Sequence, residues 1–212
     1  MLNSEITAQN IDLFNQNLRY EDPHTIIAFV LELSKSPIVT TSFGANAAAI
    51  LYATTQINPD IPVIWCDTGY NTKATYDHAK NLTDWLALNL DIFTPNRTTA
   101  FLKASFGEPT FDNPKHKTLS EIVKLEPFAR AMKKYQPDVW FTTVRKNQTA
   151  YRNTLDILSI TKDGVLRVSP FYHFSDTDME AYLKEHDLPV EPDYYDPIKA
   201  MNNRECGIQL AN

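Results

Sequence analysis

Residues 38–47 read Ile38-Val39-Thr40-Thr41-Ser42-Phe43-Gly44-Ala45-Asn46-Ala47, and this stretch decides the fold. Residues 38–41 form a short β-branched run, which is typical of a buried strand. Residues 42–46 have the small and polar side chains of a turn, and an alanine-rich helix is expected over residues 47–56. A strand that enters a helix through a tight turn is the first half of a β-α-β unit.

The same alternation continues along the chain. The sequence predicts further strands over residues 61–66, 90–93 and 139–144, and helices over residues 73–88 and 121–134, the latter begun or kinked by Pro127. Two short apolar runs flank Lys162-Asp163-Gly164 and predict a hairpin, after which Ser175 is expected to cap a helix. This order predicts an α/β fold with a doubly wound, mainly parallel sheet.

Three parts of the chain are expected to differ in character. Residues 1–36 carry two amphipathic helical patterns, the second beginning at Asp22-Pro23, and form an N-terminal helical segment. Residues 37–193 form the α/β domain. Residues 194–212 form a C-terminal tail.

Composition limits the kinds of partner. The chain has 212 residues, 43% hydrophobic and 22% charged, with a net charge of −6, which fits a soluble globular protein and disfavours nucleic acid. No apolar run reaches the roughly 20 residues that span a bilayer. Two cysteines cannot hold a four-cysteine cluster, and the five histidines lack metal-ligand spacing, so no metal is expected. With no export signal, the expected location is cytoplasmic.

Three turns should meet at one edge of the sheet, where the strands end. The turn at Ser42 and Gly44 could bring backbone N–H groups to a phosphate, or could be a turn and nothing more. The turn Asp67-Thr68-Gly69-Tyr70 could hold a ribose or a base, or could serve as a helix cap. Residues 145–152 contain two arginines and one lysine, which suit phosphate or sulfate but could also be a solvated basic face. Lys124 and Arg130 add positive charge that a solvent-exposed helix face explains equally well.

Cys206 stands in the polar segment Arg204-Glu205-Cys206-Gly207, outside any apolar run. A thiolate is the reactive form of cysteine, and a nearby cation such as Arg204 favours it. Cys206 is therefore a candidate nucleophile, with an idle surface thiol as the alternative. Cys66, within an apolar strand, is expected to be a packing residue.

Six segments together resemble the phosphoadenylyl-sulfate (PAPS) reductase family of thioredoxin-dependent sulfonucleotide reductases. They are Thr41-Ser42-Phe43-Gly44-Ala45, Asp67-Thr68-Gly69-Tyr70, Lys124-Leu125-Glu126-Pro127, Val144-Arg145-Lys146-Asn147-Gln148 with Arg152, Arg167-Val168-Ser169-Pro170, and Arg204-Glu205-Cys206-Gly207-Ile208. The resemblance implies an adenine nucleotide alpha hydrolase-like (PP-loop) fold with a mobile tail. It also implies a cytoplasmic homodimer without a bound cofactor or iron–sulfur cluster.

The resemblance further implies that PAPS is reduced to sulfite and adenosine 3′,5′-bisphosphate in sulfate assimilation. Cys206 would form an S-sulfocysteine intermediate, which thioredoxin or glutaredoxin would resolve. The substrate contacts that it implies are Ser42, Phe43, Gly44, Ala45, Asp67, Thr68, Gly69, Lys124, Arg145, Gln148, Arg152, Arg204 and Gln209.

The chain departs from the family pattern in its tail. Gln209 stands where the family usually has histidine, and the region between Pro192 and Arg204 is short. Three alternatives stay open: a cluster-free reductase of adenylyl sulfate (APS), a PP-loop ATP pyrophosphatase, and a nucleotide-binding relative without activity. Phe43, Asn46 and Ala47 disfavour the pyrophosphatase, whose loop usually reads Ser-Gly-Gly-x-Asp-Ser, and Gln209 is the best support for the inactive relative.

Overall fold

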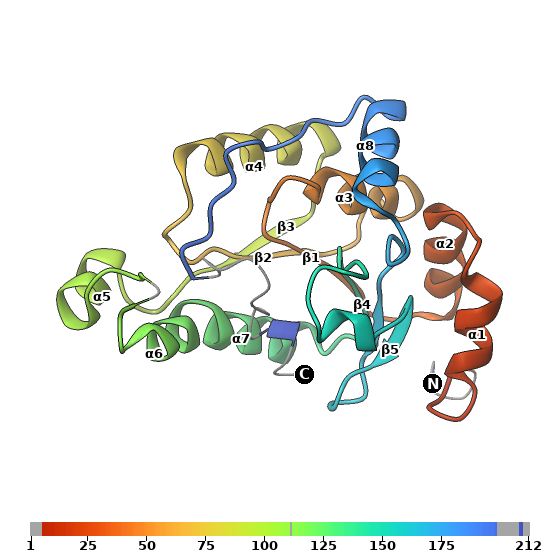
Figure 1. Cartoon of the computed structure of the whole chain (residues 1–212), viewed down its shortest axis with the longest axis horizontal. Helices are drawn as coiled ribbons and strands as arrows, with labels where there is room; N and C mark the ends of the chain where they lie inside the picture. Colours follow the sequence, from red (N-terminus) through yellow and green to blue (C-terminus); the bar gives the residue numbers. More distant parts are fainter. Residues whose placement is uncertain (1–5, 111, 199–207, 210–212) are drawn as a thin grey trace.

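A six-stranded sheet in the order β3-β2-β1-β4-β6-β5 forms the centre of the molecule (Figure 1). The computed structural model describes residues 6–110, 112–198 and 208–209. The strands are β1 (Pro37–Thr41), β2 (Val63–Cys66), β3 (Leu90–Phe93), β4 (Val139–Phe141), β5 (Leu158–Ile160) and β6 (Leu166–Val168). Every strand pair is parallel except β5–β6, which confirms the doubly wound, mainly parallel sheet.

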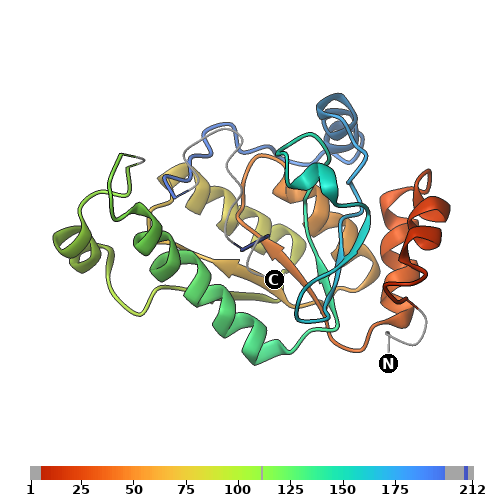
Figure 2. The ribbon, with the colours of Figure 1, turned by 60° about the horizontal axis from the view of Figure 1, so that its bottom comes forward.

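Helices cover both faces of this sheet (Figure 2). They are α1 (Ile11–Leu18), α2 (Pro23–Leu33), α3 (Ala47–Ile57), α4 (Lys73–Leu86), α5 (Thr99–Phe106), α6 (His116–Ser120), α7 (Glu126–Tyr135) and α8 (Asp176–Glu185). Among the residues described, no helix has both the length and the apolar character needed to cross a bilayer.

Alternating side chains along the strands build two separate cores. Val39 and Phe141 belong to the larger core, which includes residues of α2, α3, α4 and α8. Their strand neighbours Ile38 and Trp140 point to the opposite face, where they pack with Phe128 of α7. Because successive side chains of a strand point to opposite faces, strands covered on both faces are apolar at most positions. This explains why the strands read as continuous apolar runs.

Helix caps confirm the predicted starts of two helices. The Asp22 carboxylate accepts hydrogen bonds from the backbone N–H groups of His24 and Thr25, with Pro23 at the first helical position of α2. Ser175 and Asp178 form a reciprocal capping box at the start of α8. Each cap satisfies backbone donors that have no partner within the helix.

Two predicted elements differ from the observed ones. The predicted strand over residues 139–144 ends at Phe141, and Thr142 to Val144 turn away to line a cavity. The predicted helix over residues 121–134 is divided into a π-helical turn, Glu121–Leu125, followed by α7. Pro127 cannot donate a backbone hydrogen bond, and its ring crowds the preceding turn of a regular α-helix. The wider turn, closed by Glu126 N–H donating to the Glu121 carbonyl, accommodates it.

Helix α1 covers the edge of the sheet at strand β5. The Asn15 side-chain amide of α1 donates to the Leu158 carbonyl at 3.0 Å and accepts from the Leu158 N–H at 2.8 Å. It thereby pairs backbone groups of β5 that a neighbouring strand would otherwise pair. The first of the two helical patterns predicted within residues 1–36 becomes a helix over Ile11–Leu18.

Asp138 joins the end of α2 to the start of β4, and its loss should destabilise the fold. Its carboxylate accepts hydrogen bonds from Ser34 Oγ at 2.6 Å and from the backbone N–H groups of Lys35 and Ser36 at 2.7 and 3.0 Å. Burial raises the pKa of Asp138, but these hydrogen bonds outweigh burial and the net pKa is lowered. We expect Asp138→Ala to lower the free energy of unfolding by about 2 kcal/mol in urea titrations at pH 7.

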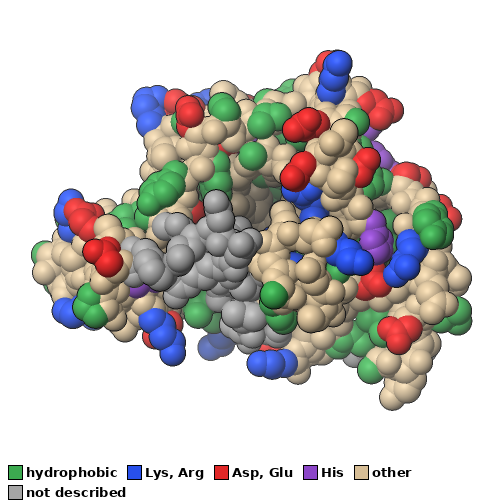
Figure 3. Space-filling view, in the orientation of Figure 1, with side chains coloured by type: hydrophobic (Ala, Val, Ile, Leu, Met, Phe, Trp, Pro, Cys, Tyr) green, Lys and Arg blue, Asp and Glu red, His purple; other side chains and the backbone are tan. Residues whose placement is uncertain are grey.

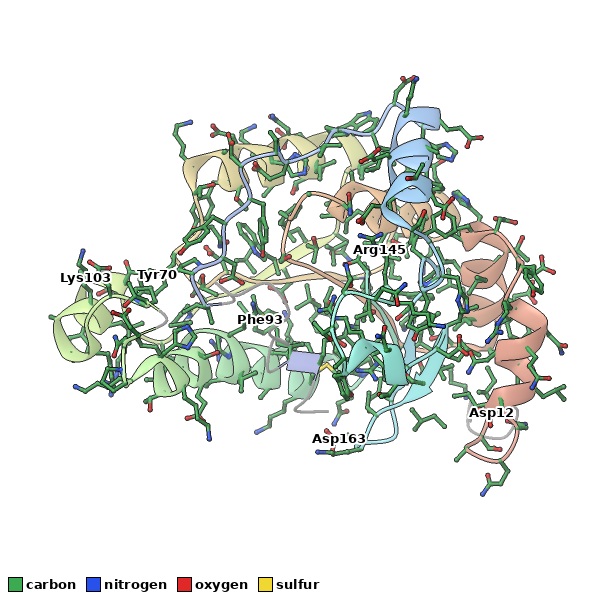
Figure 4. The ribbon with its side chains drawn as sticks, in the orientation of Figure 1. Asp12, Tyr70, Phe93, Lys103, Arg145 and Asp163 are labelled. Atoms are coloured by element: carbon green, nitrogen blue, oxygen red, sulfur yellow. The ribbon has the colours of Figure 1, made fainter. Side chains whose placement is uncertain are left out.

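The pH dependence of this contribution has a definite sign. A lowered pKa stabilises the folded chain above the unfolded value of about 4, and the stabilisation is lost as the pH falls through the folded pKa. The difference between wild type and Asp138→Ala should therefore shrink below pH 4. Asp163, at the tip of the β5–β6 hairpin (Figure 4), supplies the control, since Asp163→Ala should change stability by less than about 0.5 kcal/mol. An unchanged stability of Asp138→Ala at pH 7 would contradict this role.

Candidate functional site

A cavity of about 240 Å³ opens at the carboxyl ends of β1, β2 and β4. The chain leaves β1 toward β2 and β3 on one side, and later continues from β4 toward β6 and β5 on the other. The carboxyl ends of the neighbouring strands β1 and β4 thus mark the switch point, where doubly wound sheets bind ligands. Figure 3 shows the hollow near the middle of this face. Its described lining contains three cationic side chains, Lys124, Arg145 and Arg152, against one carboxylate, Asp196.

The turn after β1 contributes Ser42, Gly44 and Ala45 to the cavity wall. Phe43 differs from the expectation, because its ring is fully buried in the larger core and stacks edge-on against Trp65, with 4.9 Å between centroids. Phe43 has a φ of 50°, and its N–H donates to Thr41 Oγ1 at 2.9 Å. Its side chain therefore does not face a ligand, but it fixes the turn that exposes its neighbours.

The start of α3 also faces the cavity. Asn46 and Ala47 line it, and Asn46 makes no side-chain hydrogen bond to cap the helix. The N–H groups at a helix start carry partial positive charge and attract anions. Together with the small side chains of Gly44 and Ala45, this turn has the chemistry of a phosphate cradle.

The turn after β2 sends one of its three predicted residues to the cavity. Thr68 lines it, whereas Asp67 and Gly69 are absent from the lining. The Asp67 carboxylate accepts from the Gly69 N–H at 2.9 Å, from Asn71 Nδ2 at 2.8 Å and from the Tyr76 hydroxyl at 2.9 Å. Gly69 has a φ of +76°, and a Cβ there would lie 2.6 Å from Thr99 Cγ2. Asp67 and Gly69 thus shape a tight turn, as the alternative interpretation expected, whereas the cap of α4 is Thr72.

Arg145, Gln148 and Arg152 come together on the wall formed by the loop after β4. Gln148 Oε1 accepts from the Arg145 backbone N–H at 3.0 Å and from Arg152 Nη1. Arg145 Nη2 lies 2.6 Å from Asp176 Oδ1 at the start of α8, beside which Figure 4 labels it. Arg145 and Arg152 are each 7% exposed, so they are not a solvated basic face.

Lys124 reaches the cavity from the π-helical turn. Its Nζ lies 2.6 Å from Asp196 Oδ2, and both side chains are less than a tenth exposed. Arg130, in the neighbouring helix α7, instead pairs with Glu126 at the surface, with 2.7 Å between Nε and Oε1. The two cations that the sequence left equivalent therefore have different roles.

The described part of the tail returns to the same cavity. Gln209 and Ile208 line it, and Gln209 is 6% exposed. Tyr151 Oη donates to the Gln209 main-chain carbonyl at 3.1 Å, and Arg167 Nη1 donates to Gln209 Oε1 at 3.0 Å. The predicted residues Cys206 and Arg204 lie outside the described residues. In the described part of the chain, no group of three or more histidine, cysteine or acidic side chains could hold a metal ion.

The sequence did not indicate several residues of this site. Tyr194 and Asp196 line the cavity from a segment that carries no motif. The Tyr194 ring packs against Gly44, where an added Cβ would lie 3.3 Å from Tyr194 Cε1. Cys66 was expected to pack; it does contact the smaller core, and it also lines the cavity. Arg167 begins the segment Arg167-Val168-Ser169-Pro170 and places a charge inside an apolar run, but neither signal indicated its contact with Gln209.

Comparisons with known proteins agree on one family. The model of the family described as "Phosphoadenosine phosphosulfate reductase domain" matches residues 36–198. A phosphoadenosine 5′-phosphosulfate reductase of Xylella fastidiosa is 35% identical over 187 residues, which cover 86% of this chain and 78% of that protein. A reductase of the same name from Synechococcus sp. is 34% identical over 166 residues, which cover 76% and 70%.

Solved structures share the fold. The phosphoadenylyl-sulfate reductase of Candida auris, in a phosphate complex, superposes with a TM-score of 0.77 at 21% identity, covering 88% of this chain and 90% of that chain. An NH3-dependent NAD synthetase from Campylobacter jejuni gives a TM-score of 0.51 at 14% identity, covering 82% and 74%. The same sheet architecture thus occurs in enzymes with different names.

Removal of the Asp196 charge should expose Lys124 to added anions. Because both members of the pair are buried, we expect Asp196→Asn to lower the free energy of unfolding by about 3 kcal/mol. Sulfate should then raise the melting temperature of this variant more than that of wild type, since it can take the place of the lost carboxylate. Asp163→Asn is the control, because Asp163 is exposed at the tip of the β5–β6 hairpin, outside the described cavity lining, and its loss should change stability by less than about 0.5 kcal/mol. Equal responses of both variants to sulfate would show that Asp196 does not compete with anions.

Proposed function

The chain belongs to the phosphoadenosine phosphosulfate reductase family, and from this premise we propose that it reduces 3′-phosphoadenylyl sulfate to sulfite and adenosine 3′,5′-bisphosphate. One observation carries the proposal: Gln209 lines the same cavity as Ser42, Lys124, Arg145 and Arg152. Three peptide units separate Gln209 from Cys206, and consecutive Cα atoms are about 3.8 Å apart, so their Cα atoms are at most ~11 Å apart. The cysteine is thereby tethered near the cationic cavity.

In the proposed complex, the nucleotide's phosphate groups lie on the Ser42–Ala45 turn and the start of α3. Lys124, Arg145 and Arg152 neutralise the anionic groups, with Gln148 holding the two arginines in register. Buried cations bind phosphate and sulfonate oxygens strongly because little water competes for them. Thr68 borders the same space from the β2 side, where it can hydrogen-bond the nucleotide.

The first chemical step is nucleophilic attack. The Cys206 thiolate attacks the sulfur of the sulfonate group, and the bond from that sulfur to the phosphate oxygen breaks. The electron pair of the broken bond leaves with adenosine 3′,5′-bisphosphate, and the enzyme keeps an S-sulfocysteine. Cationic groups around the phosphate oxygens favour this step, because negative charge grows there as the bond breaks.

The second step needs an external dithiol, for which we propose thioredoxin or glutaredoxin. A thiolate of the dithiol attacks Cys206 Sγ, and sulfite leaves with the electron pair of the sulfur–sulfur bond. The second thiol of the donor then attacks the mixed disulfide, releasing Cys206 and an oxidised donor. The two electrons gained by the sulfonate sulfur thus come from the dithiol.

From the same family resemblance we propose a cytoplasmic homodimer. Sedimentation velocity tests whether the protein is a dimer.

Replacement of the proposed nucleophile should stop catalysis and spare binding. We expect Cys206→Ser to lower thioredoxin-dependent sulfite release by about 10³-fold or more. The affinity for adenosine 3′,5′-bisphosphate, measured by calorimetry, should change less than about threefold, because the thiol contacts the departing sulfonate and not the nucleotide. Asp163→Ala, at the exposed tip of the β5–β6 hairpin and outside the described cavity lining, is the control and should retain sulfite release. Comparable sulfite release by Cys206→Ser would overturn the mechanism, and parallel assays with APS and PAPS decide the substrate.

Loss of a cavity cation should impair the reaction, whereas loss of a surface cation should not. Arg152→Gln should reduce kcat/KM about 100-fold, since charge-assisted contacts to the substrate are removed from a buried site. Arg130→Gln removes an arginine that is paired with Glu126 outside the cavity lining, and should change kcat/KM less than about twofold. Steady-state kinetics of both variants provide the test, and similar losses in the two would argue against the proposed binding wall.

A further inference from the structure

We propose that Arg167, assisted by Tyr151, is a positioning residue that docks Gln209 on the cavity wall and so limits how far Cys206 can move from the substrate. This inference rests on the proposed function and adds to it a residue that lies outside the described lining of the cavity. Arg167 acts through Gln209, which follows the nucleophile by three positions.

The contacts of Arg167 converge on Gln209. Its Nη1 donates to Gln209 Oε1 at 3.0 Å and to the Gln209 main-chain carbonyl at 3.3 Å. Its Nε donates to Ser159 Oγ at 2.9 Å, on the antiparallel partner strand β5. The Arg167 guanidinium is therefore held between Ser159 of the sheet and Gln209 of the tail.

Burial makes this contact costly to lose. Arg167 is 2% exposed and stands in β6 between β4 and β5. Among the described residues it has no carboxylate partner, so the oxygens of Gln209 and Ser159 are the acceptors that balance its buried charge. A buried charge without hydrogen-bond partners is strongly unfavourable. Release of Gln209 would thus leave a buried cation undersatisfied, which favours the docked tail.

Tyr151 connects the dock to the proposed substrate loop. Its hydroxyl donates to the Gln209 carbonyl at 3.1 Å, so that one oxygen receives two donors from different elements. Tyr151 immediately precedes Arg152 in the loop that also carries Arg145 and Gln148. The tail and the cationic wall are therefore held by one short segment of chain.

Glutamine suits this position for a chemical reason. Arg167 needs an acceptor at residue 209, and the neutral side-chain oxygen of Gln209 supplies one, whereas a protonated histidine would repel the guanidinium. With Oε1 directed to Arg167, the amide –NH2 is the group of Gln209 that can donate to an anion in the cavity. Gln209 is thus compatible with an active enzyme.

Hydrogen exchange of the C-terminal peptide tests docking without any need for turnover. In the absence of ligand, Tyr151→Phe and Arg167→Met should speed exchange of the peptide that contains Ile208 and Gln209 about tenfold, because each removes donors to Gln209. Tyr135→Phe is the control, since it also loses one hydroxyl hydrogen bond, to Asp91 at 2.9 Å, and should leave this peptide unchanged. Unchanged exchange in Tyr151→Phe, a mild substitution that spares the core, would overturn the proposal even if Arg167→Met does not fold.

Kinetics distinguish positioning from general damage. At saturating PAPS, both variants should form S-sulfocysteine about tenfold more slowly in single turnovers, while the Kd for adenosine 3′,5′-bisphosphate changes less than twofold. Gln209→Glu keeps an acceptor for Arg167, so hydrogen exchange of the peptide should stay slow. The rate of S-sulfocysteine formation should nevertheless fall, because a carboxylate replaces the amide –NH2 of Gln209 that donates to the anion. A double-mutant cycle of Arg167→Met with Gln209→Ala should be non-additive, and additivity would contradict the coupling. Sulfite release by Cys206→Ser would refute the proposed function while leaving the exchange result intact.

Discussion

The molecule depends on balancing positive charge that is removed from water. Lys124, Arg145, Arg152 and Arg167 are each less than a tenth exposed; the first three line the cavity at the carboxyl edge of the sheet, and Arg167 lies within strand β6. Burial of a cation is unfavourable unless oxygens surround it, so each of these side chains dictates the position of an acceptor. The loop after β4, the start of α8, the segment before residue 198 and the residues at 208–209 all supply such acceptors. Elements far apart in the sequence meet here for this reason.

The acceptors fall into two chemical kinds. Arg152 and Arg167 donate hydrogen bonds to the neutral amide oxygens of Gln148 and Gln209. Lys124 and Arg145 are paired with the carboxylates of Asp196 and Asp176, which an incoming anion can replace. The described lining of the cavity thus carries three cationic side chains against one carboxylate. This combination suits the binding and release of a charged nucleotide.

Sequence patterns predicted the strands and the sheet well, because strands buried on both faces are mostly apolar and β-branched, and few other structures produce such runs. They also indicated Ser42, Gly44 and the arginines, since strand ends converge at one edge. Phe43 and Asp67 were predicted to contact the ligand, and in the structure their side chains hold the turns together. Asp196 and Arg167 were missed as site residues because their importance comes from tertiary pairing, and no local pattern records which distant group a buried charge will meet.

The π-helical turn at Glu121–Leu125 has a consequence for how this protein tolerates changes of length. Such a turn holds one residue more than the α-helical ladder on either side of it. A deletion of Leu125 would remove the wide turn that accommodates Pro127, and the residues before the deletion, Lys124 among them, would rotate by about 100° relative to α7. Lys124 would then leave the cavity although its codon was untouched. At this point the number of residues, more than their identity, keeps the cation in place.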